Sequence, residues 1–267
     1  MLTTATLLAA LTGFAPLPTP ALAAPSPAAV VAAPAAVKDM VLPALISTGD
    51  KLELRGDYFP PRSPSGRAPA LLLLHDAGSD RSSMTTLAEA YQRAGFGVLA
   101  IDLRAHGQSA TEDLDWTAAD DEAKRNLWAR AMRDVEAGAD WLSDQDGLHS
   151  SNLTVVGVGA SGALAVRHAL RDDNVRGVGM IGLETNAFGF DLAEDLVDLE
   201  GLPVIVSAAK GERDAAEGLV ASLNADDWIT VKPQRGERSE LLDDKRAVKA
   251  MVDWAEELAM PKRGGRR

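Results

Sequence analysis

The sequence predicts an α/β protein: a single domain with a mostly parallel central sheet and helices on both faces. Between residues 52 and 258, short apolar runs alternate with segments in which apolar residues recur at helical spacing. Strands that alternate with helices favour a parallel sheet joined by right-handed crossovers. The length of 267 residues, with 46% hydrophobic and 25% charged residues, suits one domain with a sizeable core or two small ones, and no sign of a second domain is seen along the chain.

The predicted strands and helices follow one another in a regular order. Residues 52–59 alternate apolar and polar side chains, as in a half-exposed antiparallel strand. Three prolines and Gly66 then indicate a turn, and residues 70–74 form a continuous apolar run typical of a strand buried on both faces. Later strands are expected at 96–101, 153–157, 178–183, 204–208 and 228–231. Helices are expected at 84–94, 121–142, 162–170, 192–199, 215–223 and 245–258.

The first 37 residues differ from the rest because none of them is charged. Residues 5–15 form an apolar run about as long as the core of a signal peptide, and Ala21-Leu22-Ala23 offers the small-x-small pattern of a cleavage site. No Lys or Arg lies near Met1, so the positive region of such a peptide is missing. We expect a secreted, periplasmic or cell-envelope protein. A disordered Ala/Pro tail is the alternative interpretation.

This composition divides the chain into four expected parts. They are a signal peptide at 1–23, an Ala/Pro-rich linker at 24–38, the folded domain at 39–260 and a basic tail at 261–267. Prolines interrupt the leader before the ~20 apolar residues that a bilayer requires; they are Pro16, Pro18 and Pro20. We therefore expect no stable membrane span in the mature chain.

Charge and cysteine content exclude several functions. There are 27 Lys and Arg against 39 Asp and Glu, and the resulting net charge of −12 disfavours binding to the phosphates of nucleic acid. The chain has no cysteine, which excludes disulfides, zinc–cysteine sites, iron–sulfur clusters and thiol chemistry. Four nearby carboxylates lack the spacing of a calcium loop; they are Asp113, Asp115, Asp120 and Asp121. We predict no metal, no cofactor and no nucleic-acid partner.

Two motifs follow the first two buried strands. Residues 75–78 read His-Asp-Ala-Gly, and residues 102–109 read Asp-Leu-Arg-Ala-His-Gly-Gln-Ser. They resemble the His-Gly loop and the Asp-Leu-Arg-Gly-His-Gly-x-Ser stretch of the α/β-hydrolase superfamily. The resemblance extends over residues 41–257 and is closest to the dienelactone hydrolase and serine esterase branches. It implies the α/β-hydrolase fold and, for active members, hydrolysis of a carboxylic ester by a Ser, Asp/Glu and His triad.

The segment 154–165 is similar to the turn that holds the nucleophilic serine in this superfamily. Counting from the end of the strand places Gly159 at the nucleophile's position, with Gly157 and Ser161 as its small neighbours. A glycine has no side chain that could attack a substrate. In an alternative register Ser161 is the nucleophile, which requires the turn to begin two residues later.

The base and the acid of the triad are expected in the last two loops. The four histidines end at residue 168, so none lies where the superfamily has its base. Residues 232–242 resemble the Pro-Gly-x-x-His-Gly-x-x-Leu-Leu pattern with Glu237 in the place of the histidine. A carboxylate of pKa about 4.3 suits a serine's proton less well than an imidazole of pKa about 6.5. Glu212 can still supply the acid, and we expect Gly159, Glu212 and Glu237 to face one pocket.

An oxyanion hole is expected where the His-Asp-Ala-Gly loop meets the turn. The backbone N–H groups of Ala77 and Ala160 would form it, with Asp76 beside them and His75 holding the loop through backbone groups. The sequence thus predicts an exported protein that has lost serine-hydrolase activity and binds a small molecule or a protein, neither of which is identified. A purely structural envelope protein would differ only in having no ligand.

The alternative function is an active carboxylic-ester hydrolase. It would use Ser161 with an unusual base such as Glu237, His75 or His106.

Overall fold

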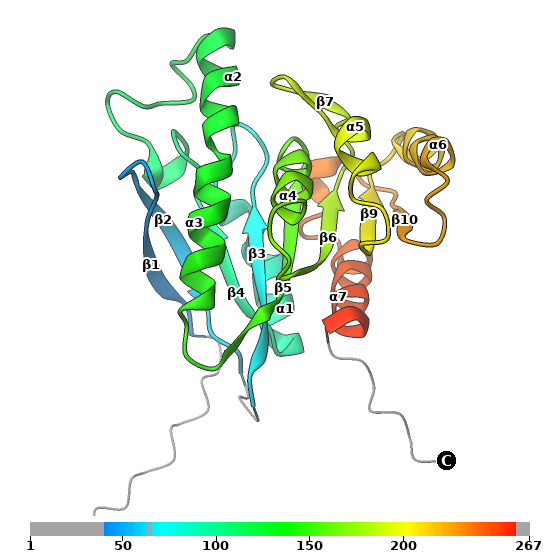
Figure 1. Cartoon of the computed structure of the whole chain (residues 1–267), viewed down its shortest axis with the longest axis horizontal. Helices are drawn as coiled ribbons and strands as arrows, with labels where there is room; N and C mark the ends of the chain where they lie inside the picture. The colour runs from blue at the N-terminus through cyan, green and yellow to red at the C-terminus, as the bar shows by residue number, and fades with distance from the viewer. Residues whose placement is uncertain (1–39, 63–65, 260–267) are drawn as a thin grey trace, which may run out of the picture. The chain divides into compact units, whose positions relative to one another are not determined.

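An eight-stranded sheet in the order β1-β2-β4-β3-β5-β6-β9-β10 forms the centre of the computed structural model, which describes residues 40–62 and 66–259 (Figure 1). Its strands are β1 (Leu42–Ser47), β2 (Glu53–Phe59), β3 (Ala68–Leu74), β4 (Gly97–Ile101), β5 (Leu148–Val158), β6 (Val175–Ile181), β9 (Val204–Ala208) and β10 (Ile229–Pro233). The pairs β1–β2 and β2–β4 are antiparallel, and the others are parallel. A separate ribbon joins β7 (Asn186–Ala187) to β8 (Phe190–Asp191).

Helices cover both faces of the sheet. They are α1 (Thr85–Ala94), α2 (Asp121–Arg130), α3 (Met132–Ser143), α4 (Ser161–Ala169), α5 (Leu192–Val197), α6 (Arg213–Leu223) and α7 (Lys245–Ala259). Side chains of α1 and α7 pack in one apolar cluster, and those of α3, α4 and α6 pack in another. Every residue of β3 and β4 is buried as a result, which is why these strands read as continuous apolar runs. The predicted α/β architecture with a mostly parallel sheet is confirmed.

The structure differs from the prediction at β1, in the helix predicted over 121–142 and at the start of β5. The strand β1 was not expected, and it tolerates Pro43 because it lies at the edge of the sheet. The single helix predicted over 121–142 is two helices, α2 and α3. They part at Ala131, whose N–H is shared between the carbonyls of Leu127 and Trp128. The strand expected from residue 153 begins at Leu148, because Leu148 pairs with Ala68 of β3 and the polar residues 149–152 lie in a bulge before the pairing resumes at Leu153.

The parallel strands bring the loops that follow them to one edge of the sheet, the upper edge in Figure 1. The loops after β3, β5, β6, β9 and β10 therefore lie close together, although their residues span positions 75 to 240. This edge contains the residues that the sequence analysis singled out.

The predicted signal peptide, linker and basic tail lie outside the described residues. In the part of the chain that the structure describes, none of the helices combines the length and the apolar character needed to cross a membrane.

Candidate functional site

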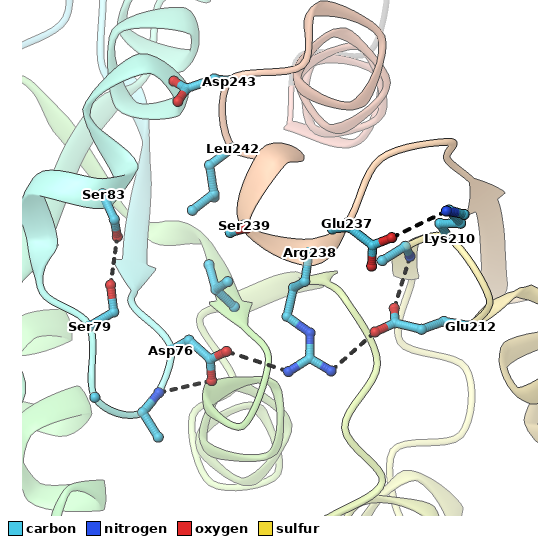
Figure 2. Close-up of a pocket in the computed structure, with 14 residues that line it drawn as sticks. Asp76, Ser79, Ser83, Lys210, Glu212, Glu237, Arg238, Ser239, Leu242 and Asp243 are labelled. Carbon is cyan, nitrogen blue, oxygen red and sulfur yellow. Dashed lines mark hydrogen bonds and ion pairs between the residues drawn. The ribbon is translucent and has the colours of Figure 1, made fainter.

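A pocket of about 650 Å³ opens at the carboxyl edge of the sheet (Figure 2). We call it the carboxyl-edge pocket. It is lined by Asp76, Ala77 and Ser79 after β3, Lys210 and Glu212 after β9, and Glu237, Arg238 and Asp243 after β10. Most of its polar lining is charged, and its carboxylates outnumber its cations.

The Asp76 carboxylate occupies the expected oxyanion hole. Its Oδ1 atom accepts hydrogen bonds from the backbone N–H of Ala77 at 2.8 Å and from that of Ala160 at 3.0 Å. These are the two donors that would stabilise a negatively charged reaction intermediate in an active hydrolase. In this chain, one of its own side chains supplies the negative charge.

Gly159 makes room for that carboxylate. It lies in the turn between β5 and α4 with φ of +54°, a left-handed conformation that favours glycine. A Cβ atom at this position would overlap the Asp76 carboxylate. A serine at position 159 is thus incompatible with the observed position of Asp76.

Ser161 is not available as a nucleophile in this structure. It is the first residue of α4 and is fully buried. Its hydroxyl lies 2.8 Å from the carbonyl of Leu74 and 3.0 Å from that of Val158, and it accepts a bond from the Val158 N–H at 2.8 Å. These bonds hold the hydroxyl in the interior of the turn. This position argues against the register that places Ser161 at the nucleophile's position.

Arg238 reaches into the pocket from the loop in which the base was expected, and it follows directly the residue that the sequence pattern indicated. Its guanidinium donates to Glu184 at 2.8 Å and to Glu212 at 3.1 Å, and it lies 3.4 Å from Oδ2 of Asp76. Figure 2 shows it between Asp76 and Glu212. One side chain thereby connects the loops after β3, β6, β9 and β10.

Glu237, which the sequence pattern places at the histidine's position, lies beside Arg238 in the wall of the pocket. Glu237 precedes the 3-10 helix Arg238–Glu240, and its backbone N–H donates to the Glu240 carboxylate at 2.9 Å. The Glu237 side chain is 65% exposed and pairs with Lys210 at 3.5 Å on the rim of the pocket. The short helix sets the register of the loop, and it points the next residue, Arg238, inward.

Glu212 lies where the acid of a triad was expected. Its Oε2 accepts from the backbone N–H groups of Leu183 at 2.9 Å and Ala209 at 2.8 Å, while Oε1 accepts from Arg238. Burial alone would lower the pKa of the Arg238 guanidinium, but hydrogen bonds to Glu184 and Glu212 outweigh it and raise that pKa above its usual range. A guanidinium that stays protonated cannot take a proton from a nucleophile.

Two histidines lie beneath the pocket and support its loops. Nδ1 of His75 lies 2.8 Å from the Asp76 carbonyl, and its Nε2 accepts from the Leu103 N–H at 3.0 Å. His106 accepts from the Gly78 N–H at 3.1 Å through Nε2. Burial lowers the pKa of both, that of His106 to about 4. His75 thus holds backbone groups of the loops after β3 and β4. Because both rings are buried and engaged, neither is placed to act as a base in the pocket.

Of the eight residues singled out from the sequence, the structure brings Asp76, Ala77, Glu212 and Glu237 to the pocket wall. Gly159 and Ala160 lie behind Asp76, and His75 and Ser161 are buried. Sequence reasoning missed Arg238 and Glu184. The signal was the pair of carboxylates predicted in one pocket, since clustered like charges favour a nearby cation and Arg238 adjoins Glu237.

Comparison with known proteins places these features in context. Residues 71–264 match the model of the alpha/beta hydrolase family. The uncharacterized protein Rv2307c of Mycobacterium tuberculosis is 30% identical over 135 residues, which cover 49% of this chain and 43% of that protein. The matched region is thus less than half the length of this curated relative.

Solved structures share the fold at lower identity. The esterase Pf2001 of Pyrococcus furiosus superposes with a TM-score of 0.63 at 15% identity, covering 84% of this chain and 92% of the esterase. A dienelactone hydrolase of Anabaena variabilis gives 0.59 at 20% identity, covering 83% and 97%. The hypothetical protein PA2218 of Pseudomonas aeruginosa gives 0.64 at 13% identity, covering 83% and 94%.

Proposed function

This chain belongs to the α/β-hydrolase family, and on that premise we propose that it does not hydrolyse esters and that its carboxyl-edge pocket binds a ligand without cleaving it. The observation that carries this proposal is the Asp76 carboxylate on the N–H groups of Ala77 and Ala160. A tetrahedral oxyanion would have to displace this carboxylate. Breaking these two hydrogen bonds costs about 1 kcal/mol each where water in the open pocket replaces them, so that displacement opposes the reaction.

The residues around Asp76 support the same proposal. Gly159 offers no nucleophile, Ser161 is buried below the turn, and Arg238 is a permanent cation where an active enzyme needs a base. Both a nucleophile and a base are missing, so no single substitution would restore the triad.

The charges of the pocket favour a ligand that donates hydrogen bonds. Arg238 is already shared among Asp76, Glu184 and Glu212, and Lys210 pairs with Glu237. Asp243 lies on the opposite side of the pocket in Figure 2, away from these pairs. An ammonium or polyhydroxylated ligand complements such a wall better than an anionic one, because like charges repel.

The first test is ester hydrolysis by the purified chain, measured with a panel of activated short-chain aryl esters beside Ser161→Ala. We expect both proteins to give the rate of the uncatalysed reaction. Turnover well above that rate that disappears in Ser161→Ala would overturn the proposal and establish the alternative, an ester hydrolase that uses Ser161.

The second test measures binding by thermal shift with a panel of amines, sugars and carboxylic acids. We expect amines or sugars to raise the melting temperature of the wild type and to lose this effect in Asp243→Asn. The matched control is Asp253→Asn, an exposed carboxylate of α7 that pairs with Lys249 outside the pocket. Stabilisation by the carboxylic acids alone would contradict the proposed ligand class.

We also propose that the chain is exported, on the strength of the uncharged residues 1–37 and the Ala21-Leu22-Ala23 pattern. The test fuses residues 1–38 to a reporter phosphatase that is active only outside the cytoplasm. We expect phosphatase activity and a mature protein that begins near residue 24. An inactive, uncleaved cytoplasmic fusion would contradict export.

A further inference from the structure

A second pocket lies at the opposite edge of the sheet, where β3 and β5 begin. Its volume is about 630 Å³, and the side chains of Arg62, Arg67, Arg93 and His149 line it together with Asn152. We call it the arginine pocket. No carboxylate occurs among the described residues that line it, although Arg93 pairs with Glu89 of α1 at 3.4 Å outside the lining and the chain as a whole has a net charge of −12. This local reversal of charge indicates a surface that meets an anionic partner.

Exposed apolar side chains adjoin the arginine pocket. Met40, Val41 and Leu42 are 40%, 44% and 39% exposed, and they make up half of the large exposed hydrophobic residues in the described part of the chain. The buried side chain of Gln92 donates to the Met40 carbonyl at 3.0 Å, and the next residue, Arg93, lines the pocket. The same side chain donates to the Pro60 carbonyl at 3.0 Å, so the start of the segment Met40–Leu42 lies against the end of α1 that contributes Arg93.

Both ends of the described part of the chain lie near this edge of the sheet. The described residues begin at Met40, and α7 ends at Ala259, which lines the arginine pocket and whose carbonyl accepts from Asn152 at 3.1 Å. The sequence that follows adds further cations, Lys262, Arg263, Arg266 and Arg267, and the sequence that precedes it carries no charge over residues 1–37.

We propose that this face, formed by the arginine pocket and Met40–Leu42, docks on the surface of an anionic lipid bilayer. The arginines would contact the lipid phosphates while the three apolar side chains enter the interface. A peripheral protein usually needs two kinds of interaction to stay on a membrane. A basic patch that binds lipid phosphates and apolar side chains that insert into the interface are a common combination. A soluble phosphate compound would need the arginines but would leave the exposed apolar side chains unexplained. The carboxyl-edge pocket would then face away from the membrane.

Co-sedimentation of the full chain with vesicles tests the proposal. We compare vesicles of phosphatidylcholine alone with vesicles in which one lipid in four is phosphatidylglycerol. We expect binding to the anionic vesicles that weakens as salt is added. Each arginine near an anionic surface strengthens binding by about fivefold, so Arg67→Glu/Arg93→Glu should weaken it by at least about 25-fold.

The matched control reverses two exposed arginines elsewhere, Arg125→Glu on α2 and Arg213→Glu on α6. It changes the net charge by the same amount and should bind as the wild type does. The melting temperatures of both double variants are compared with that of the wild type. If Arg67→Glu/Arg93→Glu is less stable, Arg67→Gln/Arg93→Gln is used instead, with an expected loss of about 25-fold.

A single fluorescent label tests the apolar contact. The chain has no cysteine, so Val41→Cys provides a unique site for an environment-sensitive dye. We expect its emission to shift to the blue with anionic vesicles, whereas the same dye on Glu122→Cys, an exposed site on α2, should not respond.

Three kinds of result would overturn the proposal. The first is vesicle binding that does not depend on charge, seen either as equal binding to both kinds of vesicle or as binding that Arg67→Glu/Arg93→Glu leaves unchanged. The second is binding of inorganic phosphate that depends on Arg67 and Arg93 without any binding to vesicles, which would indicate a soluble ligand. The third is a blue shift at position 41 that follows protein concentration without lipid, which would indicate that a second copy of the chain covers this face.

Discussion

The fit between Gly159 and the Asp76 carboxylate leads to a double-mutant prediction. Gly159→Ala adds a methyl group at a residue with φ of +54°, where it overlaps the carboxylate. The left-handed conformation costs about 1 kcal/mol for a residue that has a Cβ atom. Moving the carboxylate breaks its bonds to Ala77 and Ala160, for which we take about 1 kcal/mol each because water in the pocket replaces them.

These values predict a loss of about 3 kcal/mol for Gly159→Ala and about 2 kcal/mol for Asp76→Ala. In the double variant there is no carboxylate to displace, so its loss should be about 3 kcal/mol instead of the additive 5. The coupling is then about 2 kcal/mol, well above the additivity limit of about 0.5 kcal/mol for independent sites. The measurement is the free energy of unfolding in urea for the four proteins.

A control separates the backbone from the overlap. Gly201 has φ of +87°, and a Cβ atom there meets nothing within 4 Å. Gly201→Ala should therefore lose only the backbone part, about 1 kcal/mol, with or without Asp76→Ala. Additive losses for Gly159→Ala and Asp76→Ala would refute the argument that Gly159 is needed to accommodate Asp76.

Further predictions concern the other side chains of the site. Arg238→Met should lower the free energy of unfolding by about 2 kcal/mol, because it leaves clustered carboxylates without their cation, and added salt should reduce this loss; equal stability in urea would contradict the role given to Arg238. Ser161→Ala should cost about 2 kcal/mol in the same assay, because it leaves the buried Val158 N–H without an acceptor, and a loss below about 0.5 kcal/mol would contradict this. The pKa of His106 is lowered to about 4 by burial, so its neutral form contributes stability above its unfolded pKa that is lost as the pH falls from 6.5 towards 4. Urea midpoints at pH 7, 6 and 5 should fall less steeply in His106→Asn, and an unchanged slope would refute this assignment.

Much of the fold could be predicted from the sequence because it depends on local patterns. The runs 70–74 and 96–101 are apolar throughout since helices bury both faces of the sheet, and this pattern is visible without coordinates. The motifs at 75–78 and 102–109 indicated the superfamily. The edge strand β1 was not predicted, because its proline and its exposed apolar residues interrupt the alternation of apolar and polar residues that identifies strands.

The candidate site was predicted less completely because its chemistry depends on contacts between distant residues. The sequence alone determined that no histidine follows residue 168 and that Glu212 follows the strand β9. It also placed Gly159 at the nucleophile's position, by counting residues from the end of the preceding strand. Each of these follows from residue identity and order along the chain.

Only the tertiary structure decided which charged residue of the last loop enters the pocket and what occupies the oxyanion hole. Glu237 and Arg238 are neighbours, and the 3-10 helix turns one towards solvent and the other towards Glu212. Asp76 reaches the N–H of Ala160 because the parallel strands β3 and β5 end side by side, 84 positions apart in the sequence. Sequence patterns report the local period of a chain, whereas hydrogen bonds between loops depend on rotamers and separations of a few ångströms that the fold alone sets.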